Sequence, residues 1–417
     1  MRLIRLLLLM AGGLLTGNAL ATSSPQVTAT PPIEGAASAA SNLALPEVET
    51  LQVAAPSDVA PTRLRVRVVL PPGYRADAAI GYSVLYVNDG QDMETVAMRE
   101  SVASLSADGS IRAPIVIAID MPPDRMGAYG LADRATSRSL VADTRYGPVG
   151  VRTNAYSEWV VKTLVPLIDA RYRTRRTPDA RAVLGWSLGG LNAFSLGWQY
   201  PEVFGRVGAF SPSFWLAAER GDAAAIQRTR LAQHLVDAGP PRVGLKLFFA
   251  VGDAEEKDDR DGDGVVDAVD DVHDLVDGWR DAGAIRTKGL AQLGYTVNLD
   301  HAAHPTRADV ALYLLHGGEH NQTTWARMFP VFLRWAYAKH APALNATGRV
   351  ESYQDVPTAR VAARNVDMAS TRVRPSLRST ARHRHQSRMS SSSMPLVSRT
   401  ADSTNTSDST AKPAYSP

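Results

Sequence analysis

The sequence predicts an α/β fold with a mainly parallel central sheet and helices on both of its faces. Short apolar runs typical of buried strands alternate along the chain with amphipathic patterns typical of helices. One run, residues 180–184, leads through a Gly-rich turn at residues 185–190 into a helical pattern at residues 188–200. Strands that alternate with helices usually pair in parallel, because each helix carries the chain back to the same edge of the sheet.

The first two predicted strands differ from the others. Residues 49–53 and 64–70 are predicted to pair antiparallel, and Pro71-Pro72-Gly73-Tyr74 closes the second strand. Residues 276–310 are interrupted by four glycines, and we expect them to form an insertion over the active site. The remaining strands are predicted at residues 82–87, 114–119, 180–184, 206–210, 245–251 and 312–315, and the helices at residues 156–172, 188–200 and 323–340.

Both ends of the chain differ in composition from its middle. Residues 1–21 combine two arginines, an apolar stretch and a small-residue cleavage site, which predicts a signal peptide and an exported, periplasmic or secreted protein. Residues 22–46 are rich in Ala, Ser, Thr and Pro and are predicted to be a linker. Residues 47–342 are predicted to form one α/β domain. Residues 343–417, rich in Ser, Thr and Arg, are predicted to be a disordered basic tail.

Charge and cysteine content exclude several classes of protein. The chain carries a formal net charge of +3, but its tail alone holds 11 Lys and Arg against 5 Asp and Glu, so the domain is mildly acidic. We therefore expect no nucleic-acid partner, whereas the tail can contact anionic surfaces. We expect no transmembrane segment, because no apolar run is long enough. The absence of cysteine excludes disulfides, thiol nucleophiles and thiolate metal sites.

The turn at residues 185–190 predicts a nucleophile. Gly185 and Gly189 stand two residues before and after Ser187, and glycines there let the chain reverse sharply between a strand and a helix. The serine then lies at the tip of the turn with its hydroxyl uncovered. Ser187 is therefore the candidate for nucleophilic attack on a carbonyl carbon.

A serine nucleophile needs a base, and the base needs an acid to orient it. In an α/β-hydrolase fold the acid follows a late strand and the histidine lies on a loop before the last helix. His320 fits that position best, and His316 is the alternative. Glu255 is favoured as the acid, but Asp253 and Glu256 follow the same predicted strand and remain alternatives.

The same mechanism needs hydrogen-bond donors for the developing oxyanion. The backbone N–H of Leu188, which follows the nucleophile, is predicted to be one donor. The second is predicted to be the N–H of Gln91, in the loop after an early strand. The side chains predicted to line the acyl pocket are those of Trp186, Trp215 and Met93.

Several segments resemble the esterase D / putative esterase family of α/β-hydrolases, which includes enterochelin and feruloyl esterases. They span about residues 48–340, and they are residues 70–74, 84–91, 185–190, 200–205, 210–215 and 317–321. The resemblance implies an α/β-hydrolase fold and ester hydrolysis. It also implies Glu255 as the acid, because the family's acid commonly stands three residues after a glycine that ends a strand, here Gly252. The segment after Glu255 is longer and more acidic than this family usually shows.

That acidic insertion, residues 256–271, contains a pattern similar to the calcium loop of EF-hands. Over residues 259–270, carboxylates, a central glycine and an apolar residue stand at the spacing that wraps a hard cation. We expect a structural Ca²⁺ there and no cofactor for the chemistry. Asp270 stands where EF-hands prefer the longer Glu, so the affinity is expected to be low. The predicted ligands are Asp259, Asp261, Asp263, Asp267 and Asp270, with the backbone carbonyl of Val265.

These patterns predict an exported serine esterase with a Ser-His-Glu triad. Its partner is expected to be a small-molecule ester or an ester linked to a carbohydrate. Two alternatives within enzymes are an acyltransferase and a serine peptidase on the same fold. The alternative outside enzymes is a non-catalytic module that binds surfaces.

Overall fold

The computed structural model describes residues 43–306 and 308–339. All of them belong to the compact unit Met1–Tyr353. The predicted signal peptide, most of the predicted linker and the predicted tail lie outside the described residues. Within the described part, no helix combines the length and the apolar character needed to cross a membrane.

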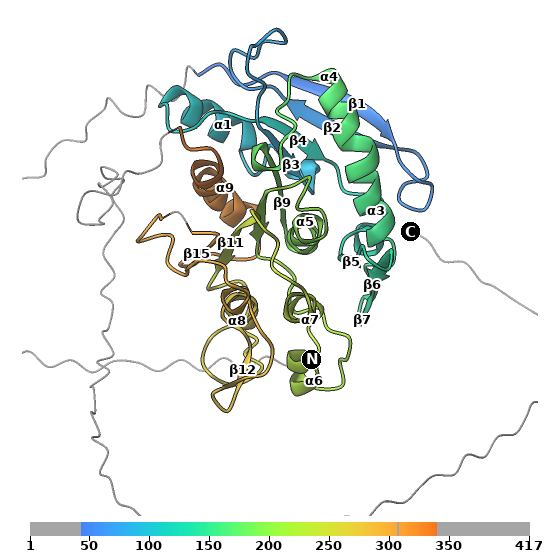
Figure 1. Cartoon of the computed structure of the whole chain (residues 1–417), viewed down its shortest axis with the longest axis vertical. Helices are drawn as coiled ribbons and strands as arrows, with labels where there is room; N and C mark the ends of the chain where they lie inside the picture. The colour runs from blue at the N-terminus through green and yellow to red at the C-terminus, as the bar shows by residue number, and fades with distance from the viewer. Residues whose placement is uncertain (1–42, 307, 340–417) are drawn as a thin grey trace, which may run out of the picture. The chain divides into compact units, whose positions relative to one another are not determined.

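A nine-stranded sheet forms the centre of the domain (Figure 1). Strand β2 pairs antiparallel with β1 and β4, and all other neighbouring strands pair in parallel. The predicted α/β fold with a mainly parallel sheet is therefore confirmed. In spatial order the strands are β1 (Val48–Ala54), β2 (Arg63–Val69), β4 (Ile115–Ile119), β3 (Val84–Val87), β9 (Arg181–Trp186), β10 (Arg206–Phe210), β11 (Lys246–Gly252), β15 (Val310–Leu315) and β14 (Val297–Asn298).

Helices cover both faces of this sheet. On one face lie α3 (Thr153–Trp159), α4 (Val165–Arg171), α5 (Leu188–Gln199), α7 (Leu231–Ala238) and α8 (Asp267–Asp277), and a π-helical turn, Val160–Leu164, joins α3 to α4. The other face is covered by α1 (Met98–Ala107) and α9 (Gln322–Tyr337), whose apolar residues pack in a second cluster. The short helices α2 (Arg125–Ala128) and α6 (Ala223–Arg228) lie in connecting segments.

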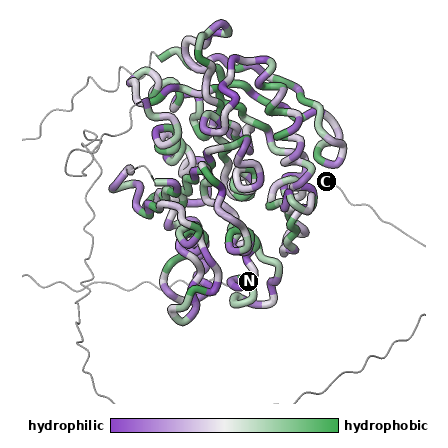
Figure 2. The backbone as a smooth tube through the Cα atoms, viewed as in Figure 1, coloured by the Kyte–Doolittle hydropathy of each residue, from purple (hydrophilic) through white to green (hydrophobic). Residues whose placement is uncertain are grey.

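Strand β4 shows why both faces need a cover. Ile115, Ile117 and Ile119 pack in one hydrophobic cluster, whereas Val116 and Ala118 pack in the other. Successive side chains of a strand point to opposite faces of a sheet, so an uninterrupted apolar run indicates burial on both sides. Figure 2 shows the central strands as mostly hydrophobic, with hydrophilic residues gathered on the outer loops.

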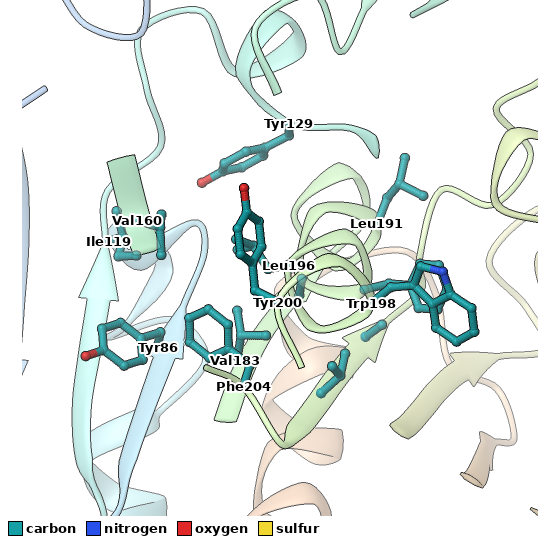
Figure 3. Packing of buried hydrophobic residues seen from close by; sticks show 14 of the residues in the cluster. Tyr86, Ile119, Tyr129, Val160, Val183, Leu191, Leu196, Trp198, Tyr200 and Phe204 are labelled. Carbon is teal, nitrogen blue, oxygen red and sulfur yellow. The ribbon is translucent and has the colours of Figure 1, made fainter. Parts of the chain in front are cut away.

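The larger cluster packs the strands against the helix that follows the Gly-rich turn. Tyr86 of β3 contacts Phe204 edge-on, with ring centroids 5.6 Å apart, and Val183 of β9 lies beside them (Figure 3). Leu191 and Leu196 place α5 on this layer. Burial of this kind contributes roughly 25 cal/mol per Å² of apolar surface, so β9 and α5 are firmly held and the turn between them is fixed from both sides.

Parts of the last third differ from the expectation. Residues 267–277 form helix α8, although no helix was predicted there and residues 267–271 were assigned to the acidic insertion. Within residues 276–310 the chain forms the hairpin β12 (Arg280–Asp281) and β13 (Ala284–Ile285) and then adds β14 to the sheet edge. Two further hairpins stand between β4 and α3, namely β5 (Leu131–Asp133) with β6 (Arg138–Leu140) and β7 (Ala142–Thr144) with β8 (Gly147–Val149).

Candidate active site

Ser187 lies in the turn between β9 and α5 with a backbone that few residues adopt. Its φ of 56° and ψ of −127° place it outside the regions favoured by non-glycine residues, and its N–H donates to the carbonyl of Phe210 at 3.0 Å. The two glycines have no room for side chains. A Cβ on Gly185 would lie 2.2 Å from the carbonyl oxygen of Gly189, and one on Gly189 would lie 2.5 Å from Asp89 Oδ2. The turn therefore has the strained geometry of a nucleophile elbow.

Ser187 lines a cleft of about 820 Å³. Its wall combines the turn after β9, the segment after β10, the hairpin β7–β8 and the acidic insertion after β11. A volume of this size accommodates a small organic ligand. The lining residues are Arg125, Met126, Thr144, Arg145, Tyr146, Val149, Ser187, Leu188, Ser211, Pro212, Ser213, Trp215, Arg220, Ile226, Glu255, Glu256, Asp258, Asp259, Arg260, Asp267, Ala268 and His320.

His320 and Glu255 meet in this cleft. His320 Nδ1 lies 2.9 Å from Glu255 Oε2, and the Glu255 side chain is only 2 % exposed. The bond ties one ring nitrogen to a carboxylate and leaves Nε2 for the nucleophile. Within the described residues no hydrogen bond joins the Ser187 hydroxyl to His320, and in ligand-free hydrolases this contact commonly tightens when substrate binds.

The alternative base and acid form a pair of their own. His316 Nδ1 lies 2.7 Å from Asp253 Oδ2, and although burial opposes it, this bond holds the pKa of Asp253 below its usual value. Neither residue lines the cleft that contains Ser187, and the His316 side chain is 82 % exposed. The described residues therefore contain two hydrogen-bonded carboxylate–imidazole pairs, and of these two only His320–Glu255 lines the cleft with Ser187.

Glu256, the third candidate acid, lines the cleft but has a different environment. Burial, together with the negative charge of Asp267, raises its pKa to about 7. A carboxyl group that is partly protonated near neutral pH is a poor partner for an imidazolium.

The two predicted oxyanion donors carry free backbone N–H groups. In the described part of the chain, neither the N–H of Leu188 nor that of Gln91 donates to a protein acceptor. Leu188 lines the cleft and begins α5, so its N–H belongs to the unpaired first turn of that helix. Gln91 belongs to a short 3₁₀ turn and does not line the cleft, and its side chain accepts from the N–H of Met121 at 3.0 Å.

Arg125, a residue of the cleft wall, was not predicted from the sequence. Arg125 binds Asp89 with two parallel hydrogen bonds of 2.7 and 2.8 Å, and Asp89 is 1 % exposed. Its Nη2 also lies 3.4 Å from the carbonyl oxygen of Trp186, directly before the nucleophile. Asp89 itself has a φ of 56°. The sequence did show Asp89 just after a predicted buried strand. Arg125, however, lies 36 residues further along the chain, and no sequence motif indicates that the two residues pair.

The prediction that Trp186 and Met93 line the pocket is wrong. Trp186 is 1 % exposed and Met93 is 3 % exposed, and both pack in the hydrophobic cluster beneath α1 and α9. Trp186 stacks on Trp325, with ring centroids 5.4 Å apart, because the side chains of β9 alternate between the faces of the sheet. Trp215 does line the cleft, and the guanidinium carbon of Arg220 lies 5.2 Å from the centre of its ring.

The prediction that residues 276–310 lie over the active site is also wrong. No residue in the described part of 276–310 lines the cleft. This segment instead packs along the far edge of the sheet, where β14 pairs with β15. The roof comes from the hairpin β7–β8 and from the acidic insertion, because these segments follow strands whose carboxyl ends meet beside Ser187.

The acidic insertion brings three of the predicted metal ligands together. Carboxylate oxygens of Asp259, Asp261 and Asp263 lie within 4.8 Å of one another in the described residues. Asp259 accepts from the N–H groups of Gly262 and Gly264 at 2.8 and 3.0 Å, which curls the loop around its first carboxylate. A hard cation prefers such clustered oxygens.

The remaining predicted ligands lie elsewhere. Asp267 is the first residue of α8 and pairs with Arg260 at 3.1 Å, so it does not join the three clustered carboxylates. Asp270 faces a neighbouring hollow that Asp261 and Asp263 also line. Burial and the charge of Asp274 raise the pKa of Asp270 to about 7. The backbone carbonyl of Val265 lies in the same loop.

A buried charge network connects the insertion to the cleft. Arg260 lines the cleft and also pairs with Asp271 of α8. Arg230, which is 1 % exposed, pairs with both Asp271 and Asp274. Buried charges need such partners, since an unpaired ion inside a protein is strongly destabilising. The network holds the insertion against α7 and α8.

Comparisons with known proteins identify a matching family and several similar proteins. A family model described as Putative esterase matches residues 57–277, more than half of the chain. The matched range contains Ser187 and Glu255 and ends before His320.

Two curated relatives are similar over shorter stretches. "Uncharacterized protein YbbA" of Bacillus subtilis is 29 % identical over 153 residues, which are 36 % of this chain and 57 % of the relative. "Iron(III) salmochelin esterase" of Escherichia coli O6:H1 is 38 % identical over 99 residues, which are 22 % of this chain and 24 % of the relative. The chain thus spans less than two thirds of the length of either one.

A solved structure of a ferulic acid esterase from Anaeromyces mucronatus is 14 % identical. The likeness covers 71 % of this chain and 93 % of the other, with a TM-score of 0.46.

Proposed function

This chain belongs to the Putative esterase family, and on that premise we propose that it hydrolyses a carboxylic ester through Ser187, His320 and Glu255. One observation carries the proposal. Ser187 stands in the strained conformation of a nucleophile elbow and lines the same cleft as His320, which is tied to the buried Glu255. These are the three roles that acyl transfer to a serine requires.

Each residue has a defined part in the proposed reaction. His320 Nε2 takes the hydroxyl proton as the Ser187 oxygen attacks the ester carbonyl carbon. The tetrahedral intermediate then collapses, the leaving alcohol takes that proton from His320, and an acyl-serine remains. Water, deprotonated by His320, attacks the acyl carbon. The Ser187–acyl bond then breaks, His320 returns the proton to the Ser187 oxygen, and the acid is released. Glu255 keeps His320 in the correct tautomer and stabilises the imidazolium.

The oxyanion is proposed to lie against the N–H groups of Leu188 and Gln91. Both groups are without an acceptor in the described residues, and loss of one such donor costs about 3 to 4 kcal/mol of transition-state stabilisation. Leu188 also benefits from its place at the start of α5, where the helix dipole favours negative charge.

Hydrolysis of a series of p-nitrophenyl esters of increasing acyl length tests this function. The wild-type chain is expected to release p-nitrophenol, and Ser187→Ala is expected to release it no faster than buffer. If both proteins were equally inactive on all esters, the non-catalytic module would be the better explanation. Activity that persisted in Ser187→Ala would place the nucleophile elsewhere.

The substrate is proposed to be a small ester or an ester carried by a carbohydrate. Hydroxycinnamoyl and acetyl esters of sugars, siderophore lactones and simple acyl esters all fit a mixed polar and apolar cleft of this size. An acyltransferase would share the acyl-enzyme and differ in the second step. Addition of an alcohol acceptor during hydrolysis separates the two, because a transferase forms the new ester in preference to the free acid.

We also propose that the acidic insertion binds a structural Ca²⁺ through Asp259, Asp261 and Asp263. The clustered oxygens support this, and bound Ca²⁺ would neutralise carboxylates that now repel one another. Because Arg260 of the same loop lines the cleft, the ion would also order one wall of the proposed active site. The ion would take no part in the chemistry.

Export to the periplasm or the medium remains a proposal that rests on the signal-like residues 1–21. Fractionation of cells that express the chain, followed by N-terminal sequencing of the recovered protein, tests it. The expected mature protein begins at Thr22.

A further inference from the structure

We infer that Ser211 is a positioning residue that holds one carboxylate oxygen of Glu255 and leaves the other for His320. The inference rests on the proposed triad and extends it by one residue. Ser211 directly follows β10, which pairs with β9, the strand that Ser187 directly follows. It lines the cleft, but it has only 3 % of its surface exposed.

The two oxygens of Glu255 have separate partners. Oε1 accepts from the Ser211 hydroxyl at 2.5 Å and from the backbone N–H of Gly252 at 2.7 Å. Oε2 lies 2.9 Å from His320 Nδ1. A carboxyl group held by three bonds has one orientation, so the position of the His320 ring is determined by Ser211 and Gly252 as well as by Glu255.

The direction of the Ser211 hydroxyl follows from its second partner. Trp325 of α9 donates its indole N–H to Ser211 Oγ at 3.0 Å. An indole N–H can only donate and an ionised carboxylate can only accept, so the single hydroxyl proton of Ser211 must point to Glu255. The bonds therefore run in one direction, from Trp325 through Ser211 to Glu255, and each strengthens the next.

The backbone conformation of Ser211 is one that favours glycine, so the presence of serine there indicates that the hydroxyl is needed. Its φ is 44°, in the left-handed region that glycine adopts without strain, and its N–H donates to the carbonyl of Ala250 at 2.7 Å. Glycine would relieve the strain at this position but would remove the hydroxyl. Strain that persists beside a candidate active site is typical of a functional constraint.

Trp325 links the acid to the base a second time. Its ring contacts the His320 ring edge-on, with centroids 5.4 Å apart and planes at 84°. Trp325 is itself fixed, because it stacks on the buried Trp186 at an interplanar angle of 16°. One side chain of α9 thus orients His320 by packing and Glu255 through Ser211.

Ser211→Ala should slow turnover and change its pH dependence. Loss of a hydrogen bond to a charged group corresponds to a fall in kcat of about 10- to 100-fold, with little change in KM. The negative charge of Glu255 would then be shared among fewer donors, which favours the imidazolium form of His320. The acid limb of the pH profile for p-nitrophenyl acetate hydrolysis is therefore expected to move to higher pH.

Two further variants distinguish positioning from general stability. Trp325→Phe keeps the ring and removes only the indole N–H, so a smaller loss and a shift of the acid limb in the same direction are expected. The double variant should be no slower than Ser211→Ala, because both act in one chain of bonds. Ser195→Ala is the matched control, since Ser195 of α5 is buried like Ser211 and its hydroxyl accepts from the N–H of Ala132 in β5 rather than binding Glu255. Ser195→Ala should keep the wild-type acid limb.

An activity-independent readout separates this inference from the proposed function. Diisopropyl fluorophosphate phosphorylates an activated serine with release of fluoride, and its rate of reaction with Ser187 follows the state of His320 without any need for the natural ester. A shifted acid limb for labelling in Ser211→Ala and Trp325→Phe supports the positioning role.

If the labelling rate of both variants kept the acid limb of the wild type, the inference would be wrong even if Ser187 hydrolyses esters. If Ser211→Ala fails to fold, Trp325→Phe decides alone. Absence of Ser187 labelling in the wild type would instead count against the proposed function.

Discussion

The His320 ring lies 2.9 Å from a Glu255 carboxylate that is almost fully buried, and four residues away His316 forms a similar pair with the more exposed Asp253. Both pairs join a histidine to a carboxylate, but they differ in whether they line the cleft that contains Ser187. His320 lines the cleft with Ser187, whereas His316 does not. This difference allows the proposed base and acid to be tested against a matched pair on the same loops.

Glu255→Gln should lower kcat by about 10³- to 10⁴-fold, because an amide cannot stabilise the imidazolium and favours the wrong tautomer. Asp253→Asn makes the equivalent change in the other pair and should leave kcat close to that of the wild type. Steady-state hydrolysis of p-nitrophenyl acetate measures both. An equal loss in the two variants, or a loss confined to Asp253→Asn, would show that the acid has been assigned incorrectly.

Arg125→Ala should destabilise the domain, because it leaves the buried Asp89 without its partner. Breaking a buried ion pair from one side costs about 3 kcal/mol or more, and Asp89 is 1 % exposed. Urea denaturation of the two proteins measures the difference. Arg75→Ala is the control, since the pair of Arg75 with Asp77 is exposed on both sides and should contribute nothing measurable. A stable Arg125→Ala variant would mean that Asp89 is solvated or protonated in the folded state.

His301 should make the domain sensitive to acid. Burial lowers the pKa of His301 to about 4, and its ring packs against Phe248. Below the usual histidine pKa the unfolded chain binds a proton that the folded chain does not, so stability is lost as the pH falls from about 6.5 to about 4, by up to about 3 kcal/mol. His301→Gln should lack this part of the pH dependence in thermal melts recorded from pH 7 to 4. His304→Gln, three residues away and exposed, should melt like the wild type across the series.

Calcium should stabilise the domain if the acidic insertion binds it. A ligand present at about 100 times its Kd adds about 2.7 kcal/mol to the stability of the folded state, which corresponds to several degrees in Tm. The increase should appear when Ca²⁺ is added to chelator-treated protein and should disappear in Asp261→Asn. Asp281→Asn is the control, because Asp281 lies outside the insertion and pairs with Arg286. Identical melting curves in excess EDTA and in excess Ca²⁺ would rule out a structural calcium.

The strands and the nucleophile elbow could be predicted because their signals are local. Gly185 is required by a close backbone contact within the turn itself, although Gly189 is required by the distant Asp89 side chain. The apolar runs of β9, β10 and β11 are continuous in the sequence. The sequence also allowed a candidate acid and a candidate histidine to be named in order after Ser187, and the hydrogen-bonded Glu255 and His320 are among those candidates. What remained open was the choice between Glu255 and Asp253, which depends on how their loops fold.

Features that depend on the packing of distant segments could not be predicted. Trp186 stands directly before the nucleophile, but its side chain points to the opposite face of the sheet and packs on Trp325. Arg125 reaches Asp89 across 36 residues, and Ser211 reaches Glu255 across 44. Helix α8 was missed because its first aspartates also complete a calcium-loop pattern, although Val269, Val272 and Val276 have helical spacing.

The central claim is that Ser187 forms a covalent acyl-enzyme, and trapping that intermediate tests it most directly. Wild-type protein is mixed with p-nitrophenyl acetate, quenched in acid within the first turnover, digested and analysed by mass spectrometry. The account predicts one added acetyl group on the peptide that contains Ser187 and none on the corresponding peptide of Ser187→Ala. Ester hydrolysis without any acetylated Ser187 peptide, in wild-type protein quenched early, would contradict it.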